Sequence, residues 1–283
     1  MSKHSEKAPL PLPESFNLPL TGVESHAHLD GKHFADDLEV VLERARKTGV
    51  ARIGQIFMSS ALWEENKSRF LPHDEFFFLL GIHPTEAELL TDEEYEKLRH
   101  ILKTESRMKA VGEIGLDYYW KDCPRETQRT AFVRLLHLAG ELDLPVAIHS
   151  RDATEDTIAI LTAEGFKDHP LVWHCFGGDA ALAERILELG WHISIPGPVT
   201  FPANQALRDA LRQIPADRLM IETDCPYLAP MPYRGKRNEP AYLAFTIQAM
   251  AEARGEDPAD LWTACGVTAL KLFRLPQLAH CAI

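Results

Sequence analysis

Two histidines stand one residue apart in the stretch VESHAHLD, Val23 to Asp30, and they are the first feature of the chain that could do chemistry. In a β-strand, side chains at positions i and i+2 point to the same side, so the imidazoles of His26 and His28 would converge on one point. Neutral imidazole is the commonest protein ligand of metal ions. Taken alone, such a pair is more often two surface histidines leaving a turn, so a metal site needs further ligands.

Four more metal-competent side chains lie within or directly after short apolar runs that have the length of buried strands. They are Glu113 in VGEIGLD, His149 in AIHS, His174 in VWHC and Asp224 in IETD. Each one singly could be a core histidine or a carboxylate that caps a helix. In barrels of parallel strands, however, the C-terminal strand ends meet at one face and carry the chemistry. Six such coincidences favour one shared pocket.

The elements that must position these residues alternate regularly along the chain. After the segment that enters Ser25, seven apolar runs follow: ARIGQIFM, EFFFLLGIHP, MKAVGEIGLD, LPVAIHS, PLVWHCF, WHISIPG and RLMIETD. Helices are expected over 35–48, 61–70, 92–104, 125–142, 152–164, 179–189, 204–213 and 241–254, with an additional C-terminal helix over 258–273. Eight β–α units predict a parallel sheet with right-handed crossovers, closed into a (β/α)8 TIM barrel.

The first twenty residues do not fit this pattern. They contain four prolines and no continuous apolar segment of the kind found in a secretory signal. We expect residues 1–20 to be a poorly ordered leader or an edge segment, and residues 21–283 to be a single domain. No apolar run approaches the roughly 18 residues that span a bilayer, so no membrane association is expected.

Composition narrows the class of protein further. The five cysteines include no C-x-x-C pair, which disfavours a disulfide framework and is consistent with a reducing cytoplasm. The chain has 30 Lys and Arg against 42 Asp and Glu, a net charge of −12. That balance argues against a protein that coats nucleic acid through a basic surface. It leaves open an enzyme that handles a nucleic-acid end at a metal centre, where bound cations supply positive charge. No nucleotide-binding glycine motif is present.

The six candidate ligands divide into two sets by strand order. His26 and His28 on the first strand would join Asp224, because the eighth strand neighbours the first in a closed barrel. His149 and His174, on the fifth and sixth strands, would form the second set. The sequence therefore predicts two cation sites in one pocket.

Glu113 on the fourth strand is the natural bridge between the two sites, since a carboxylate has two oxygens to share. Two divalent ions about 3.5–4 Å apart can clamp an in-line displacement at phosphorus and activate water near neutral pH. The mixed nitrogen and oxygen ligand set is compatible with Zn, Mn, Ni or Mg.

At this level of detail the chain resembles the TatD family of metal-dependent hydrolases, within the amidohydrolase-like barrel superfamily. The motifs that carry the resemblance run in order from about Thr21 to the C-terminal helix: ESHAHLD, GIHP, VGEIGLDYY, AIHSRDA, WHCFGG, SIPGPVTF, IETDCPYLAP and RGKRNEP. The resemblance implies a (β/α)8 fold, a divalent-metal site and DNase activity, typically exonucleolytic from the 3′ end. It assigns the metal role to His26, His28, Glu113, His149, His174 and Asp224.

One position departs from the family pattern. The first motif usually begins with Asp, and here that position is Glu24. Strand alternation puts Glu24 on the side of His26 and His28, so it is expected to alter the surroundings of the ligands and to leave the ligands intact. Cys175 and Cys225 each follow a proposed ligand and are expected to face away from the pocket as packing residues.

Several cationic or polar residues are candidates for holding the substrate. His83, in GIHP, ends the third strand and either contacts phosphate or shapes its loop. Arg151 could hold a phosphate in bidentate fashion or pair with an acidic neighbour at a helix start. Arg234 and Lys236, in the basic loop YRGKRN, could contact phosphate or belong to a solvated loop.

The function that these observations favour is a cytoplasmic, metal-dependent phosphodiesterase that acts on DNA ends, with no obligatory protein partner. Asp224 would orient or deprotonate the attacking water, and Glu113 would be the second catalytic carboxylate. Activation of water by a metal is not specific to phosphorus, so an ester or amide hydrolase, such as an aminoacyl-tRNA deacylase, is the alternative. A metal-binding protein without turnover would have the same ligands.

Overall fold

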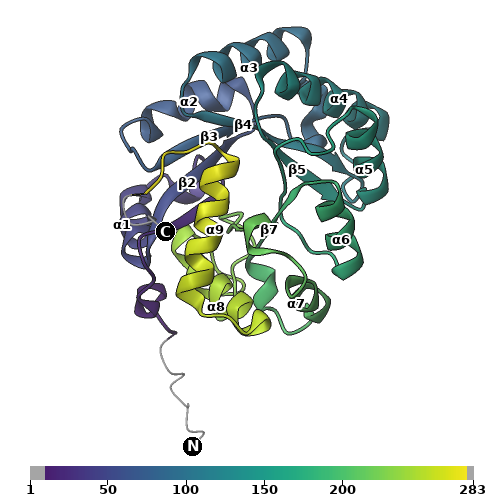
Figure 1. Ribbon diagram of the computed structural model, residues 1–283. Coiled ribbons are helices and arrows are strands. Elements are labelled where there is room, and N and C mark those ends of the chain that lie inside the picture. Colours follow the sequence, from purple (N-terminus) through teal and green to yellow (C-terminus); the bar gives the residue numbers. More distant parts are fainter. Residues whose placement is uncertain (1–9, 279–283) are drawn as a thin grey trace, which may run out of the picture.

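Eight parallel strands, hydrogen-bonded in chain order, surround the centre of the molecule in the computed structural model, which describes residues 10–278 (Figure 1). The strands are β1 (Gly22–Ala27), β2 (Val50–Phe57), β3 (Phe76–Leu80), β4 (Met108–Asp117), β5 (Val146–Arg151), β6 (Leu171–Trp173), β7 (His192–Ile195) and β8 (Leu219–Ile221). Beyond the end of β8 the chain meets β1 through a parallel bridge between Ala27 and Cys225. The ring is therefore nearly closed, and the predicted (β/α)8 barrel is confirmed.

Helices follow the strands, and all but the last lie outside the ring (Figure 1). They are α1 (Leu38–Thr48), α2 (Ser60–Phe70), α3 (Asp92–Thr104), α4 (Arg125–Leu142), α5 (Thr154–Ala163), α6 (Ala180–Glu188), α7 (Gln205–Leu211), α8 (Leu243–Arg254) and α9 (Pro258–Leu272). The predicted ranges of α3 and α4 coincide with the observed ones. The predicted start of α1 is three residues early, because a 3-10 turn at Lys32–Phe34 precedes it. Within residues 10–278, no helix is long and apolar enough to cross a membrane.

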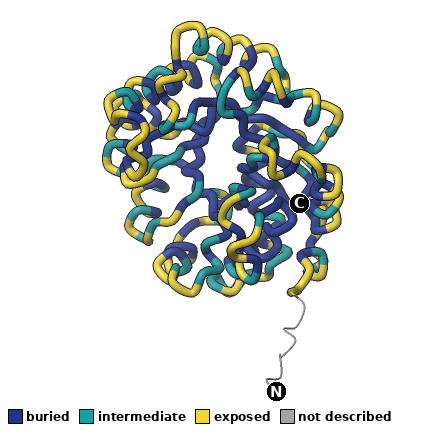
Figure 2. The backbone as a smooth tube through the Cα atoms, turned by 180° about the vertical axis from the view of Figure 1, so that it is seen from behind, coloured by how far each residue is buried: buried dark blue, intermediate teal, exposed yellow. Residues whose placement is uncertain are grey.

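Buried residues run along the strands and parts of the surrounding helices (Figure 2). Their side chains form two main clusters, one between strands and helices and one inside the barrel, and a smaller third cluster around Tyr233 and Phe245. The cluster inside the barrel consists mainly of inward-facing strand residues: Val23, Ile56, Phe77, Leu79, Ala110, Ala147, Val172 and Met220. Their alternation along each strand follows from the two-residue period of β structure. The six predicted ligands lie beyond this apolar filling, toward the C-terminal ends of the strands.

The additional C-terminal helix, α9, closes the opposite end of the barrel. A Cβ atom on Gly22, at the start of β1, would lie 1.9 Å from the ring of Trp262, so glycine is required for α9 to approach this closely. Just beyond α9, the ring of Phe273 lies 4.8 Å from that of Phe77. The N-terminal ends of the strands are thereby sealed with apolar side chains.

The predicted leader, residues 1–20, is described only from residue 10 onward, and residues 1–9 lie outside the described residues. Residues 10–20 contact the C-terminal helices. The Phe16 ring packs edge-on against Phe245 at 5.4 Å, and Trp262 donates a hydrogen bond to the Pro19 carbonyl at 2.9 Å. This part of the predicted leader therefore packs against α8 and α9.

Candidate active site

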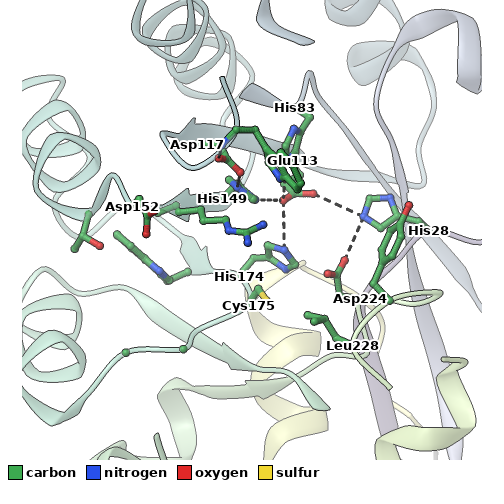
Figure 3. A pocket seen from close by; sticks show the side chains of 18 of the residues that line it. His28, His83, Glu113, Asp117, His149, Asp152, His174, Cys175, Asp224 and Leu228 are labelled. Carbon is green, nitrogen blue, oxygen red and sulfur yellow. Dashed lines mark hydrogen bonds and ion pairs between the residues drawn. The ribbon is translucent and has the colours of Figure 1, made fainter. Parts of the chain in front are cut away.

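A cavity of about 940 Å³ opens at the C-terminal ends of the strands (Figure 3). Five of the six predicted metal ligands line it, namely His28, Glu113, His149, His174 and Asp224. The sixth, His26, is buried beside them. The structure thus brings all six together, although they come from β1, β4, β5 and the segments that follow β1, β6 and β8.

His26 and His28 meet Asp224 as the first set predicts. The two Nε2 atoms lie 3.2 Å apart, and His28 Nε2 is 3.5 Å from Asp224 Oδ1. The closure of the barrel produces this contact, because Asp224 N donates to the His26 carbonyl at 3.0 Å. Burial, reinforced by His174, lowers the pKa of His26, which favours the neutral imidazole that binds metals.

Glu113 stands between the two sets, and each of its oxygens faces a different pair of imidazoles (Figure 3). Oε2 lies 3.3 Å from His26 Nε2 and 3.7 Å from His28 Nε2. Oε1 lies 2.6 Å from His149 Nδ1 and 3.3 Å from His174 Nε2. Burial alone would raise the pKa of Glu113, but the charge of His174 and the hydrogen bonds of the surrounding histidines hold it well below its usual range.

The second set differs in one respect from the prediction. His174 does not pair with His149 alone, because its ring also stacks on that of His26 with centroids 3.6 Å apart. His26, Glu113 and His174 each offer a ligand atom, and these atoms lie within 4.8 Å of one another. His83, Asp117 and His149 form a further such group.

These spacings fit a divalent cation. Two ligand atoms bound tetrahedrally at about 2.0–2.1 Å from a zinc ion lie about 3.4 Å apart. The distances of 3.2–3.7 Å among His26, His28 and Glu113 bracket that value. The donors are imidazole nitrogens and carboxylate oxygens, which suit several divalent metals.

Two further carboxylates each contact one of the predicted ligand histidines. Asp117 Oδ2 lies 2.9 Å from His149 Nε2, and Glu222 Oε1 lies 2.9 Å from His174 Nδ1. Carboxylates in such positions fix the orientation of a ligating imidazole and raise its basicity. Asp117, the last residue of β4, also lines the cavity. Glu222 was missed, although its place two residues before Asp224 in IETD was the available signal.

Glu24 connects two backbone segments next to the predicted ligands. Its carboxylate is fully buried and accepts hydrogen bonds from the backbone N–H groups of His26 and Thr223, at 3.0 Å each. It therefore ties β1 to the segment after β8, behind the ligands. Burial raises the pKa of Glu24 to about 8, despite these hydrogen bonds.

Two of the four predicted substrate-binding residues line the cavity. His83 Nε2 lies 3.9 Å from Glu113 Oε1, and burial lowers the pKa of His83 to about 4. Arg151 makes no ion pair with any residue in 10–278. The alternative prediction, a salt bridge with an acidic residue at the start of α5, is therefore wrong. Glu155 pairs with Arg185 instead. The Arg151 guanidinium lies 3.8 Å from the centroid of the Tyr119 ring.

The other two predicted substrate-binding residues, Arg234 and Lys236, do not line the cavity. Arg234 lies over the ring of Phe201 at 4.4 Å, and Lys236 Nζ is 5.5 Å from the ring of Tyr233. Their neighbour Arg237 pairs with Asp37 at 2.7 Å, which fastens the loop to the start of α1. The loop therefore leaves the strand end and places its exposed cations away from the pocket.

The expectation for the two cysteines holds for one of them. Cys225 is buried in the core, as predicted. Cys175 lines the cavity, so the prediction that it faces away was wrong. The strand does not continue as assumed: β6 ends at Trp173, and Cys175 has a φ of 50°, which turns the chain. Burial raises the pKa of the Cys175 thiol well above its usual value.

The barrel and the convergence of histidines with carboxylates at one of its ends define the class: a metal-dependent hydrolase built on a (β/α)8 barrel. The sequence model of the family described as TatD related DNase matches residues 23–274. The chain belongs to the TatD family.

Relatives and solved structures agree with this assignment. YabD of Bacillus subtilis (strain 168), an uncharacterized metal-dependent hydrolase, is 36% identical over 252 residues, covering 89% of this chain and 98% of its own. The 3′-5′ ssDNA/RNA exonuclease TatD of Erwinia tasmaniensis is 35% identical over 256 residues, covering 88% and 98%. The crystal structure of YJJV, a TatD homologue from Escherichia coli K12, superposes with a TM-score of 0.85 at 30% identity, covering 91% of this chain and 99% of that one.

Proposed function

We propose that this TatD-family hydrolase is a deoxyribonuclease that trims DNA ends in the 3′-to-5′ direction and requires divalent metal ions. The observation that carries the proposal is the position of Glu113, whose two carboxylate oxygens face two separate sets of imidazoles. That arrangement suits two ions sharing one bridge, the geometry used for in-line displacement at phosphorus. The relative from Erwinia tasmaniensis, named as an exonuclease, adds support for a nucleic-acid substrate.

In this proposal His26, His28 and Asp224 hold one ion and His149 and His174 hold the other, with Glu113 shared. Zn, Mn, Ni and Mg are all compatible with these donors. When bound, the ions would activate a water molecule and stabilise the negative charge on the phosphoryl oxygens.

The remaining steps belong to the protein's own side chains. Asp224 orients the attacking water and accepts its proton. Burial alone would raise the pKa of Asp224, but the hydrogen bond from His28 and the charge of His174 lower it, so the carboxylate is ionised and able to accept. His83 donates a hydrogen bond from Nε2 to a phosphoryl oxygen, and Arg151 binds a neighbouring phosphate.

We further propose that residues 21–283 act as one domain and that the protein works in the cytoplasm on DNA ends without an obligatory protein partner. The four cysteines within residues 10–278 are all free thiols, which is usual in a reducing compartment. Arg234 and Lys236 lie outside the cavity, so in this proposal they bind a phosphate of the DNA strand farther from the cleaved bond.

The test is a substrate panel with metal-stripped protein to which each cation is added back. End-labelled single-stranded DNA, RNA, duplex DNA, charged tRNA and simple ester and amide substrates are compared, with and without chelator. We expect chelator-sensitive trimming of single-stranded DNA to exceed any ester or amide turnover. Efficient deacylation of charged tRNA without nuclease activity would replace the proposal with its alternative.

A further inference from the structure

Four large hydrophobic side chains are exposed near the mouth of the cavity, and a cluster of exposed apolar groups is typical of a ligand-binding surface. Tyr119 and Trp120 follow β4, with 49% and 50% of their surfaces exposed. Tyr227 and Leu228 follow β8, with 61% and 37% exposed. In the order of strands around the barrel, β4 and β8 are opposite each other. Trp120 and Tyr227 both line the cavity, so aromatic groups border it from two sides.

The pair after β4 is held in a fixed position. The N–H groups of Tyr119 and Trp120 both donate to Asp117 Oδ1 at 3.0 Å. The other oxygen of Asp117 contacts His149, one of the proposed ligands. One buried carboxylate therefore positions the aromatic pair relative to the metal centre.

Arg151 adds a positive charge to this aromatic pair. Its guanidinium lies 3.8 Å from the Tyr119 ring centroid and 5.7 Å from that of Trp120. Arg151 is the only Lys or Arg among the described residues that line the cavity. A guanidinium beside exposed aromatic rings is the combination that binds single-stranded nucleic acid, where bases stack on rings and phosphates meet cations.

We propose that Trp120 and Tyr227 form a base-stacking subsite, in which the unpaired base next to the scissile phosphate stacks on Trp120 and Arg151 binds the phosphate beyond it. This proposal rests on the proposed nuclease function and assigns the residues that select single strands. Inside a duplex the faces of a base are covered by its stacked neighbours, and its edge is held by pairing, so the base must leave the duplex before it can enter the subsite, which therefore favours single strands. The subsite contacts the flat aromatic face that every base has, so it should bind all base sequences similarly.

The test compares two substrates and three variants. One substrate is end-labelled single-stranded DNA, and the other is the same strand with abasic residues at the end being trimmed. The variants are Trp120→Ala, Trp120→Phe and, as a matched exposed control on α1, Val40→Ala. Stacking of one base contributes enough binding that its loss should raise KM about 10-fold.

We expect Trp120→Ala to raise KM for the normal strand about 10-fold with kcat retained. On the abasic strand the same substitution should change KM less than about twofold, because no base is left to stack. Trp120→Phe should recover most of the loss, and Val40→Ala should behave like the wild-type protein.

A second readout does not depend on turnover. A strand with a cleavage-resistant end and 2-aminopurine beside the terminal phosphodiester should lose fluorescence on binding, since stacking quenches this base. Wild-type protein and Trp120→Phe should quench it and Trp120→Ala should not. Equal effects of Trp120→Ala on both strands, with quenching retained, would overturn the subsite while leaving the nuclease proposal intact. If the wild-type protein with metal cleaves neither strand, the proposed function is wrong and the subsite falls with it.

Discussion

At the N-terminal end of the barrel the strands enclose Phe77 against Phe273, with ring centroids 4.8 Å apart, whereas at the C-terminal end they enclose His26 against His174, stacked at 3.6 Å. Both pairs of rings are almost completely buried. Burial of the first pair stabilises the fold by removing apolar surface from water. Burial of the second opposes folding unless the imidazoles are paired or hold a cation.

This difference shows how the chain separates stability from chemistry. Among the described residues, the cluster inside the barrel at the apolar end consists of aliphatic and aromatic side chains with Met220, and α9 covers it by approaching β1 at Gly22. The polar end concentrates ionisable groups around Glu113. Substitutions at one end should therefore change folding free energy, and substitutions at the other should change metal binding and turnover.

The largest effect is expected at the polar end, from Asp224→Asn. The amide cannot accept the proton of the attacking water, so kcat should fall by about 10²–10⁴-fold. Steady-state kinetics on labelled single-stranded DNA measures the loss, and circular dichroism serves as the control for folding. A kcat within about twofold of the wild-type value would remove Asp224 from the catalytic role.

At the apolar end, Phe77→Ala should lower the free energy of unfolding by about 3–5 kcal/mol, because the substitution leaves a cavity inside the barrel that neighbouring side chains cannot fill. Urea unfolding of the metal-free protein measures this change, with the exposed Val40→Ala as the matched control. The folded variant should bind metal as the wild-type protein does. Loss of metal with unchanged stability would contradict the separation of the two ends.

Asp117→Asn tests whether the buried carboxylates support the ligands. Asp117 contacts His149 at 2.9 Å, and loss of such a supporting group typically weakens metal affinity by about 10–100-fold. Competition with a metal-binding dye gives the affinity of each site. Only the site that includes His149 should weaken. An equal loss at both sites would mean that Asp117 acts on the fold as a whole.

The smallest effect is expected outside the cavity, from the double variant Arg234→Ala and Lys236→Ala. Removing two cations that bind phosphate should raise KM for DNA several-fold and reduce the salt slope by about 0.7 for each phosphate that is no longer neutralised. Metal content and kcat should stay as they are. Unchanged KM and salt slope would show that the loop is simply solvated.

The sequence was sufficient to predict the barrel and to select the six residues that meet at its polar end. Each of the six lies within or directly after an apolar run, and parallel strands bring such positions to one face. The contact of Asp224 with His28 followed from barrel closure alone.

The failures share a physical origin in the loops beyond the strand ends. Cys175 faces the cavity because its backbone turns at a positive φ, which alternation along a strand cannot foresee. Arg234 and Lys236 are near Asp224 in sequence, yet the ion pair of Arg237 with Asp37 directs their loop elsewhere. The place of Glu222 two residues before Asp224 pointed to the pocket, but its contact with His174 is defined only by the folded chain.

The central claim, that Glu113 is shared by two ions, is tested most directly by counting the metal. Elemental analysis and Mn²⁺ titration should find two ions per wild-type chain, with an EPR spectrum of coupled Mn²⁺ because the ions share a carboxylate. Glu113→Gln should lose affinity at both sites, whereas His28→Ala should weaken only one. Two ions retained by Glu113→Gln with unchanged affinity, or a wild-type protein that binds a single ion, would contradict the account.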